Sequence, residues 1–271
     1  MVIEYPYGVG DIVTRVLECG ERGPELVMIH GVGARADRWR TVMPLLASAG
    51  YHVFAPDLPG HGFASKEHDF PYGSPAFAAF TNELISSLGL RTPVLVGTSL
   101  GGHVAALAAL TGAAPPPALV LIGASGIVTV DRQTISDTAR ALVLTDTGVR
   151  EKLRFVVADP DLVTDEWVRE ELRINTSPGA REAASDVEHY VRTQLNDDVV
   201  GSALAASGIP TLVLWGERDQ WMPLDVGLRV HEALPKAEWH IIENVGHAPF
   251  FERPDLFAKR AVEFLAEKCP V

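Results

Sequence analysis

The sequence is poor in cysteine and lacks the features of an exported protein. Its only cysteines, Cys19 and Cys269, lie near opposite ends of the 271 residues, and no C-x-x-C pair occurs. This usage argues against a disulfide framework and against a zinc site. The N-terminal stretch "MVIEYPYGVGD" has neither the basic start nor the apolar segment of a signal peptide. We therefore expect a reduced, cytoplasmic setting and no bound metal.

Positive charge is also scarce. Acidic residues number 35 against 23 lysines and arginines, a net charge of −12, which disfavours nucleic acid as a partner. The one basic cluster, "ARADRWR", places Arg35, Arg38 and Arg40 close together, and we expect these side chains to lie on a solvated helix rather than to bind a phosphate.

A membrane span is not predicted. Residues 104–130 carry no charge, but the three prolines at 115–117 divide them into two parts. Neither part reaches the roughly 20 residues that a spanning helix needs. We interpret the segment as a buried helix, a rigid connector and a buried strand.

Short apolar runs, each ending in a Gly, Pro or Asp turn, recur along the chain. They lack the alternation of a half-exposed strand, which favours a parallel sheet covered on both faces. Helical stretches separate them, so the pattern predicts an α/β fold with a mostly parallel, doubly wound sheet. The expected strands are 25–31, 52–58, 93–99, 118–125, 211–219 and 239–247; the expected helices are 36–50, 74–89, 100–112, 224–234 and 254–268; residues 2–18 are expected to form an antiparallel hairpin at one edge.

The alternation is interrupted between about 128 and 205. This block has helical patterning, as in "DTARALVLTDTGVREKLRFVV" and "TDEWVREELRI", and no strand-like runs. We interpret residues 128–205 as a helical cap inserted between two strands, and residues 1–127 and 206–271 as the core domain.

The stretch "VGTSLGGH", residues 96–103, places a serine between glycines at the point where a strand ends and a helix begins. Ser99 in this G-x-S-x-G pattern is typical of a nucleophile elbow, a tight turn that lifts the hydroxyl clear of the sheet. Side chains at Gly97 and Gly101 would clash in such a turn. We therefore interpret Ser99 as the candidate nucleophile.

A serine hydroxyl needs a base, and the base needs an orienting acid. His247 follows the last expected strand, and Asp219 ends the strand "TLVLWGERD", so both lie at the carboxyl edge of the sheet, where sites of such sheets gather. Asp225 is the weaker alternative because it begins an expected helix, where its role would be capping. His103, one turn after Ser99, is expected to pack against the sheet.

Two backbone N–H groups are expected to stabilise an oxyanion. One belongs to Leu100, directly after the candidate nucleophile. The other belongs to Val32, in the glycine-flanked loop of "MIHGVGARADRW".

Five ordered motifs resemble the α/β-hydrolase superfamily: His30-Gly31, "DLPGHG" (57–62), "GTSLGG" (97–102), "GERDQWMP" (216–223) and "GHAPFFERP" (246–254). The resemblance runs from about residue 25 to the C-terminus and implies the α/β-hydrolase fold with a Ser, Asp, His order of catalytic residues. A serine at the elbow argues against the haloalkane dehalogenase and epoxide hydrolase branches.

The sequence leaves three alternatives for the function within the superfamily. A carboxylic ester hydrolase is the first interpretation. The second is a C–C bond hydrolase, since "ELRINTSPGAREA" (171–183) is similar to a cap segment of the meta-cleavage-product hydrolases, in which an arginine, here Arg173, binds the acidic end of the substrate. Against this, those enzymes have a tryptophan where Ala248 stands and an asparagine that "ADRWRT" lacks. The third is a ligand-binding protein without turnover.

The substrate pocket is expected to accommodate a small molecule without any organic or metal cofactor, in a monomer or homodimer. Trp221 and Phe250 are the candidate substrate contacts beside Arg173. Further candidates for its walls are Trp39, Trp167, Phe251, Phe63 and Met222.

Overall fold

The computed structural model describes residues 1–131, 133–134 and 143–270. Its centre is an eight-stranded sheet in the order β1-β2-β4-β3-β5-β6-β7-β8, in which β1 and β2 form an antiparallel hairpin, β2 is also antiparallel to β4, and all later neighbours are parallel. The predicted mostly parallel sheet with an edge hairpin is confirmed. The strands are β1 (Val2–Val9), β2 (Ile12–Cys19), β3 (Glu25–Ile29), β4 (His52–Pro56), β5 (Val94–Thr98), β6 (Leu119–Ile122), β7 (Thr211–Gly216) and β8 (Glu238–Ile242).

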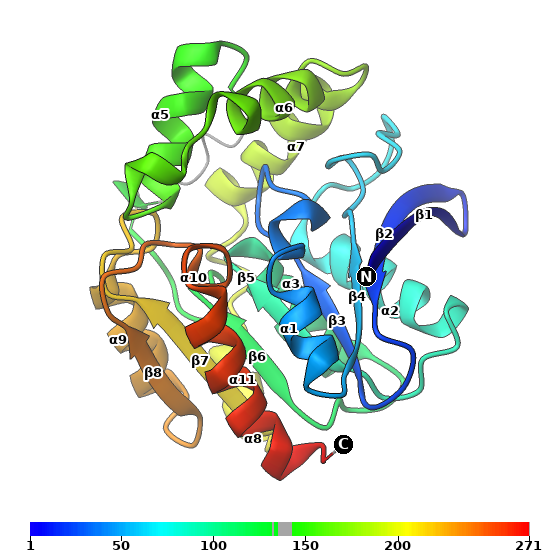
Figure 1. Cartoon of the computed structure of the whole chain (residues 1–271), viewed down its shortest axis with the longest axis vertical. Helices are drawn as coiled ribbons and strands as arrows, with labels where there is room; N and C mark the ends of the chain where they lie inside the picture. The colour runs from blue at the N-terminus through cyan, green and yellow to red at the C-terminus, as the bar shows by residue number, and fades with distance from the viewer. Residues whose placement is uncertain (132, 135–142, 271) are drawn as a thin grey trace.

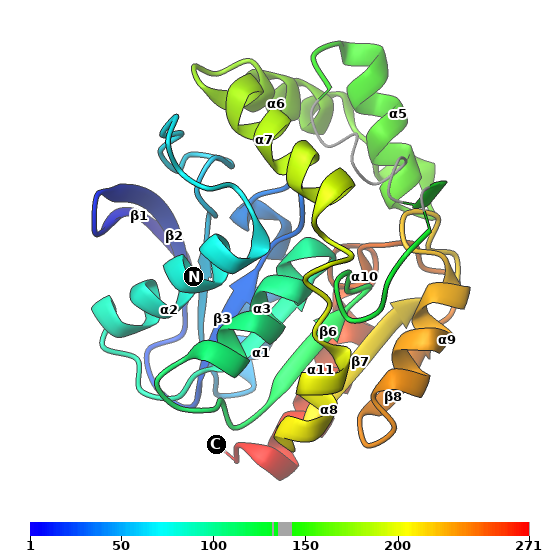
Figure 2. The same ribbon diagram turned by 180° about the vertical axis from the view of Figure 1, so that it is seen from behind.

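The apolar runs became strands because both faces of the sheet are covered. Every residue of β5, β6 and β7 is buried. One face packs against α2 (Ser74–Ser87), α3 (Leu100–Thr111), α8 (Gly201–Ser207) and α9 (Leu224–Ala233), which lie in front in Figure 2. The other packs against α1 (Met43–Ser48), α10 (Pro249–Glu252) and α11 (Pro254–Lys268), which lie in front in Figure 1.

The helix expected over 36–50 is divided. A 3₁₀ turn, η1 (Ala36–Trp39), is followed by α1. Pro44 lies in the first turn of α1, where its missing N–H does no harm. The same residue further along a continuous helix would have interrupted the hydrogen bonding.

In the described part of the chain, three longer helices and one short 3₁₀ turn lie between β6 and α8. They are α5 (Asp146–Val156), η2 (Pro160–Leu162), α6 (Asp165–Asn175) and α7 (Ala180–Thr193). Together they form a separate layer above the core (Figures 1 and 2). We call α5, η2, α6 and α7 the cap helices. Part of the helical pattern expected here, residues 137–142, lies outside the described residues.

The helix α8 returns to the core. Leu204 on α8 joins the hydrophobic cluster that contains α3, and α8 contacts both α3 and α9. The boundary expected at residue 205 therefore falls inside a helix that packs on the core, because the burial of Leu204, rather than the loss of strand pattern, decides where the chain rejoins it.

Candidate active site

Ser99 lies at the turn between β5 and α3. Its backbone has φ 55° and ψ −124°, and it is one of two non-glycine residues with positive φ in the described chain. Such backbone angles are strained for a residue with a side chain. Two hydrogen bonds hold the turn, from Ser99 N–H to Ile122 O at 2.9 Å and from Ser125 N–H to Ser99 O at 3.1 Å.

The glycines on either side of Ser99 are required by close backbone contacts. A Cβ at position 97 would lie 2.1 Å from Gly101 O, and a Cβ at position 101 would lie 2.3 Å from His30 O. These separations are far below van der Waals contact. The sequence-based expectation that neither position tolerates a side chain agrees with this geometry.

Asp219 and His247 meet at the ends of neighbouring strands. Oδ2 of Asp219 accepts a hydrogen bond from Nδ1 of His247 at 2.7 Å. The other carboxylate oxygen accepts from the backbone N–H groups of Trp221 at 2.9 Å and Met222 at 2.8 Å. Because the imidazole proton is then on Nδ1, Nε2 carries the free lone pair.

Nε2 of His247, the atom that would accept a proton, is buried. It has no hydrogen-bond partner in the described part of the chain. Ser99 and His247 line the same cavity, although no hydrogen bond joins them within the described residues. Catalytic hydrogen bonds of this type are often loose before substrate binds. Asp225, the alternative acid, lies in the first turn of α9.

Glu252 holds the loop that carries His247. Its carboxylate accepts from Gly246 N–H at 2.9 Å and from Ala158 N–H at 2.7 Å. His247 N–H itself donates to Val156 O at 2.8 Å, so the end of α5 is attached to this loop. The sequence analysis missed Glu252, although it stands within "GHAPFFERP".

Val32 and Leu100 carry the two backbone N–H groups that the sequence predicts for an oxyanion hole. Val32 lines the cavity, and Leu100 is the first residue of α3 behind Ser99. Neither backbone N–H donates to an acceptor in the described residues. His30 fixes the loop before Val32, since its Nδ1–H donates to Gly31 O and its Nε2 accepts from Leu58 N–H, both at 2.9 Å. Burial lowers the pKa of His30 to about 4, so its ring is neutral at pH 7.

The cavity lies between the cap helices and the carboxyl ends of the strands. Much of its wall is apolar, and Trp221, Phe250 and Trp167 belong to it as the sequence suggested. Trp39, Phe251, Phe63 and Met222 do not line it: Trp39 packs against Phe250 from behind, with ring centroids 4.1 Å apart, and the Phe63 side chain is exposed.

The expectation for the arginine cluster is wrong. Arg35 is 1% exposed, and Arg38 lines the cavity instead of a solvated helix face. Both donate at 2.7 Å to Glu171, on α6 of the cap. Arg40, which pairs with Asp37, is the most exposed of the three, with 39% of its side chain accessible against 12% for Arg38. Arg35 and Arg38 were expected to be exposed to solvent. They are largely buried because Glu171, from a segment distant in the sequence, forms ion pairs with them.

One further expectation fails on geometry. Arg173 is exposed on α6 and is not among the residues that line the cavity, so the structure does not bring it to Ser99. His103 is fully buried in α3 and also makes a hydrogen bond that the sequence did not predict. Its Nε2–H donates to Asp198 O at 2.9 Å, in the segment that precedes α8.

The described residues hold no group of three or more His, Cys, Asp or Glu side chains that could bind a metal ion. No helix in the same part of the chain is long and apolar enough to cross a bilayer.

Known proteins resemble this chain over almost its full length. A family model described as "Alpha/beta hydrolase family" matches residues 26–260. The chain is 29% identical, over 95% of its length and 94% of the relative, to the 2-hydroxy-6-oxo-2,4-heptadienoate hydrolase of Pseudomonas putida strain F1.

Solved structures show the same fold. A meta-cleavage product hydrolase from Pseudomonas fluorescens IP01 superposes with a TM-score of 0.86 at 26% identity, covering 97% of each chain. A putative lipase from Acinetobacter baumannii AYE superposes with a TM-score of 0.86 at 28% identity, covering 98% of this chain and 91% of the other.

Proposed function

Because this chain belongs to the alpha/beta hydrolase family, we propose that it is a serine hydrolase that cleaves a carbon–carbon bond in an acidic 2-hydroxy-6-oxo-dienoate. Among the relatives with descriptive names, those that act on such dienoates align with more than 90% of this chain. The observation that carries the proposal to this chain is the site itself, because Ser99 and His247 line one cavity and Asp219 accepts from Nδ1 of His247 at 2.7 Å. Two cationic side chains, Arg38 and Lys152, belong to the same wall, which suits a substrate that bears a carboxylate.

The proposed mechanism assigns one task to each group. Nε2 of His247 takes the proton of the Ser99 hydroxyl, which attacks the 6-oxo carbon of the ketonised substrate. The N–H groups of Val32 and Leu100 donate to the resulting oxyanion. Asp219 keeps the imidazole proton on Nδ1 and stabilises the imidazolium that forms.

The tetrahedral adduct then collapses. Its electrons re-form the carbonyl, the bond between the fifth and sixth carbons breaks, and His247 returns the proton to the departing five-carbon fragment. An acyl group remains on Ser99. Water, activated by His247, releases it as a carboxylic acid and restores the hydroxyl of Ser99.

Ester hydrolysis by the same residues is the second candidate. The observation that favours it is the similarity to a putative lipase at 28% identity over 98% of this chain. An ester would need no prior ketonisation, and the proton on His247 would go to the leaving alcohol.

The experiment compares both substrates on the native protein and on Ser99→Ala. We expect the native protein to consume a 2-hydroxy-6-oxo-heptadienoate, followed by loss of its dienolate absorbance, with two product acids identified by mass spectrometry. Ser99→Ala should lose at least about 10⁴-fold in turnover while remaining folded.

Three other outcomes would change the conclusion. Turnover of p-nitrophenyl butyrate without dienoate cleavage would establish the ester hydrolase instead. A dienoate turnover retained in Ser99→Ala would refute the nucleophile. No turnover of either substrate, together with no adduct from a serine-directed organophosphorus probe, would favour the ligand-binding protein.

A further inference from the structure

The loop that carries His247 is bonded to the cap by two separate contacts. His247 N–H donates to Val156 O at 2.8 Å, at the end of α5. The carboxylate of Glu252 makes the second contact. Its Oε2 accepts from Ala158 N–H at 2.7 Å, just after α5, and its Oε1 accepts from Gly246 N–H at 2.9 Å, beside the proposed base. One side chain of the core therefore joins the end of a cap helix to the loop of His247.

The two backbone segments that Glu252 joins are in direct contact. A Cβ at Gly246 would lie 2.7 Å from Ala158 N and 2.8 Å from Val156 O. Both separations are below van der Waals contact, so a larger residue would fit only if the cap segment or the loop moved. Because main-chain atoms touch main-chain atoms here, a shift of one segment displaces the other.

The turn that carries Asp219 holds the other side of the same loop. Arg218 N–H donates to Val245 O at 2.8 Å. The loop is thus enclosed between the turn of the acid and the end of α5. The hydrogen bond of 2.7 Å between Nδ1 of His247 and Oδ2 of Asp219 depends on the position that these two neighbours give the loop.

The end of α5 also forms part of the cavity wall. Leu153 and Val156 line the cavity that Ser99 and His247 share. A substrate that fills this cavity therefore contacts the segment whose main chain is bonded to the loop of the base. The position of the cap and the position of the imidazole depend on each other through this segment.

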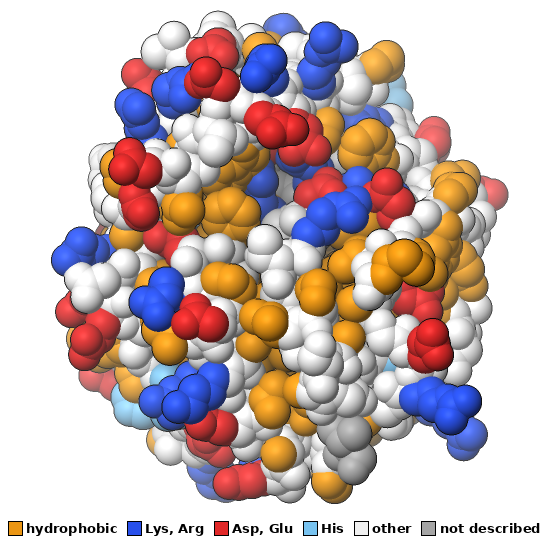
Figure 3. Space-filling view, viewed as in Figure 1, with side chains coloured by type: hydrophobic (Ala, Val, Ile, Leu, Met, Phe, Trp, Pro, Cys, Tyr) orange, Lys and Arg blue, Asp and Glu red, His pale blue; other side chains and the backbone are white. Residues whose placement is uncertain are grey.

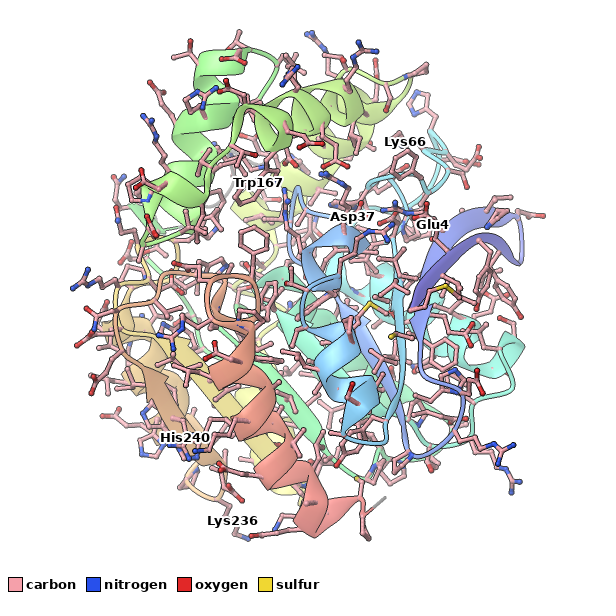
Figure 4. All side chains as sticks on the ribbon, in the orientation of Figure 1. Glu4, Asp37, Lys66, Trp167, Lys236 and His240 are labelled. Atoms are coloured by element: carbon pink, nitrogen blue, oxygen red, sulfur yellow. The ribbon has the colours of Figure 1, made fainter. Side chains whose placement is uncertain are left out.

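A hydrophobic contact supports these hydrogen bonds. Trp167 of α6 lies where the cap helices meet the core (Figure 4), and its ring packs against Phe251 with centroids 4.8 Å apart. Phe251 directly precedes Glu252 in α10 and packs against the apolar cluster of the cap, which includes Val157. Charged side chains of both signs border hydrophobic ones along the line where the cap meets the core (Figure 3). The helix α10 therefore contacts both α6 and the segment that follows α5.

The two donors explain why this position suits a carboxylate. Glu252 is partly buried, and burial raises the pKa of its carboxyl, although the N–H groups of Ala158 and Gly246 oppose the change. Each N–H group meets a different oxygen. A glutamine has nearly the same shape, but it offers one acceptor oxygen and an amide nitrogen that cannot accept. The substitution Glu252→Gln therefore breaks one of the two bonds without removing the side chain.

We propose that Glu252 is a positioning residue that couples the cap to the catalytic base, because it holds the end of α5 and the loop of His247 in one fixed arrangement. The inference deepens the proposed function, on which it rests for the role of His247 as the base. It applies equally to carbon–carbon bond cleavage and to ester hydrolysis. Without the second oxygen, the two segments should loosen together, and Nε2 of His247 should no longer be held beside Ser99.

The test compares Glu252→Gln with Glu243→Gln and with the native protein. Both variants remove one negative charge from the same region of the chain, but Glu243 is exposed, three residues before Gly246. Amide hydrogen exchange, followed by mass spectrometry of peptides, measures residues 153–159 and 243–250 separately. It shows whether the cap segment and the loop respond together.

Two further measurements report the position of the base, which a purely structural role of Glu252 would leave unchanged. Proton NMR detects the Nδ1 proton shared by His247 and Asp219, whose low-field signal is identified by its absence in His247→Gln. The rate at which diethyl p-nitrophenyl phosphate labels Ser99 measures activation of the hydroxyl by the base. It requires no knowledge of the natural substrate.

In Glu252→Gln we expect exchange to become at least about tenfold faster in both segments, because the bond that joins them is broken. The Nδ1 proton signal should broaden or disappear. Labelling of Ser99 should slow at least about tenfold, since a well-placed general base contributes about 10²–10⁴ to a rate. Glu243→Gln should match the native protein in all three measurements.

Native exchange in residues 153–159 of Glu252→Gln would overturn the coupling. A native Nδ1 signal and a native labelling rate, with both segments loosened, would overturn the positioning role. If thermal melting shows that Glu252→Gln does not fold, Glu252→Asp, which keeps both oxygens on a shorter side chain, decides by the same criteria. A native protein that the phosphate ester does not label, but whose two segments and Nδ1 signal respond to Glu252→Gln, would refute only the proposed reaction.

Discussion

His103 makes the stability of this protein depend on pH in a way that can be calculated. The side chain is 0% exposed in the first turns of α3, and its ring lies so close to Gly126 that a Cβ there would be 2.2 Å from the ring. Burial lowers the pKa of His103 to about 4, from the model-compound value of 6.5, although the hydrogen bond to Asp198 O opposes the change. The folded protein therefore keeps this ring neutral where an unfolded chain protonates it.

The direction in which pH changes the stability follows from proton binding in the folded and unfolded states. Between pH 6.5 and 4 the unfolded state binds a proton at His103 that the native state excludes, so acidification stabilises the unfolded state. With these two pKa values, lowering the pH from about 7 to about 5 removes about 2 kcal/mol from the free energy of unfolding through this residue alone.

His103→Gln removes the titrating ring but keeps an amide N–H near the place of Nε2, where it can donate to Asp198 O. We expect the variant to be less stable than the native protein near neutral pH, because the planar ring no longer fills its site. On acidification from about pH 7 to about pH 5, the free energy of unfolding of the variant should fall by about 2 kcal/mol less than that of the native protein.

The assay is urea unfolding of both proteins at about pH 7 and about pH 5, with equal m-values as the condition for comparison. His68→Gln is the matched control, since His68 is exposed in the folded protein and its replacement should leave the pH dependence unchanged. Equal losses on acidification in His103→Gln and in the native protein would refute the reasoning.

Three further changes test the site and its support. Asp219→Asn should lower turnover on the order of 10⁴-fold by favouring the wrong imidazole tautomer, and steady-state kinetics with near-native turnover would remove Asp219 from the proposed mechanism. Gly97→Ala should lower the melting temperature or prevent folding, because the new Cβ would lie 2.1 Å from Gly101 O; a native melting temperature would show that the turn can relax. Glu171 has its pKa lowered to about 2 from 4.5, so its contribution to stability is complete above pH 4.5 and is lost as the pH falls toward 2. Unfolding of Glu171→Gln should therefore depend less on pH within that window than unfolding of the native protein, and equal dependence would contradict the assignment.

The candidate catalytic residues could be selected from the sequence because their signals are local. A serine between two glycines, directly after an apolar run, specifies a strand-to-helix turn whatever the rest of the chain does. Asp219 and His247 each follow an apolar run as well, and parallel strands end at one edge of a sheet, which explains why the structure brings these two side chains within 2.7 Å.

The ion pairs that Arg35 and Arg38 form with Glu171 could not be predicted in the same way. "ARADRWR" looks like a solvated charged surface because nothing within a few residues neutralises it. Its partner Glu171 is 136 residues from Arg35 and sits on a cap helix whose position over the core no local pattern specifies. Without that position, a sequence argument has no reason to bury an arginine, since unpaired burial is strongly unfavourable.

Arg173 shows the opposite error, because a residue that was expected to line the pocket is exposed. A resemblance in "ELRINTSPGAREA" selected it, but the side that a helical residue presents depends on how the helix packs. Here α6 turns Trp167 and Glu171 toward the core and leaves Arg173 exposed. The sequence pattern indicated an amphipathic helix, but it did not indicate which residues the polar side chains of that helix would contact.

The sequence by itself determined the parallel sheet, its edge hairpin, the strained turn at Ser99 and the order of the three candidate catalytic residues, because apolar runs, glycines and strand ends act over a few residues. Tertiary structure alone decided which charges are buried at the cavity, which aromatic rings line it, and that α8 belongs to the core. Those features depend on contacts between segments that are distant in the sequence, and the energies of these contacts arise only once the segments have packed together.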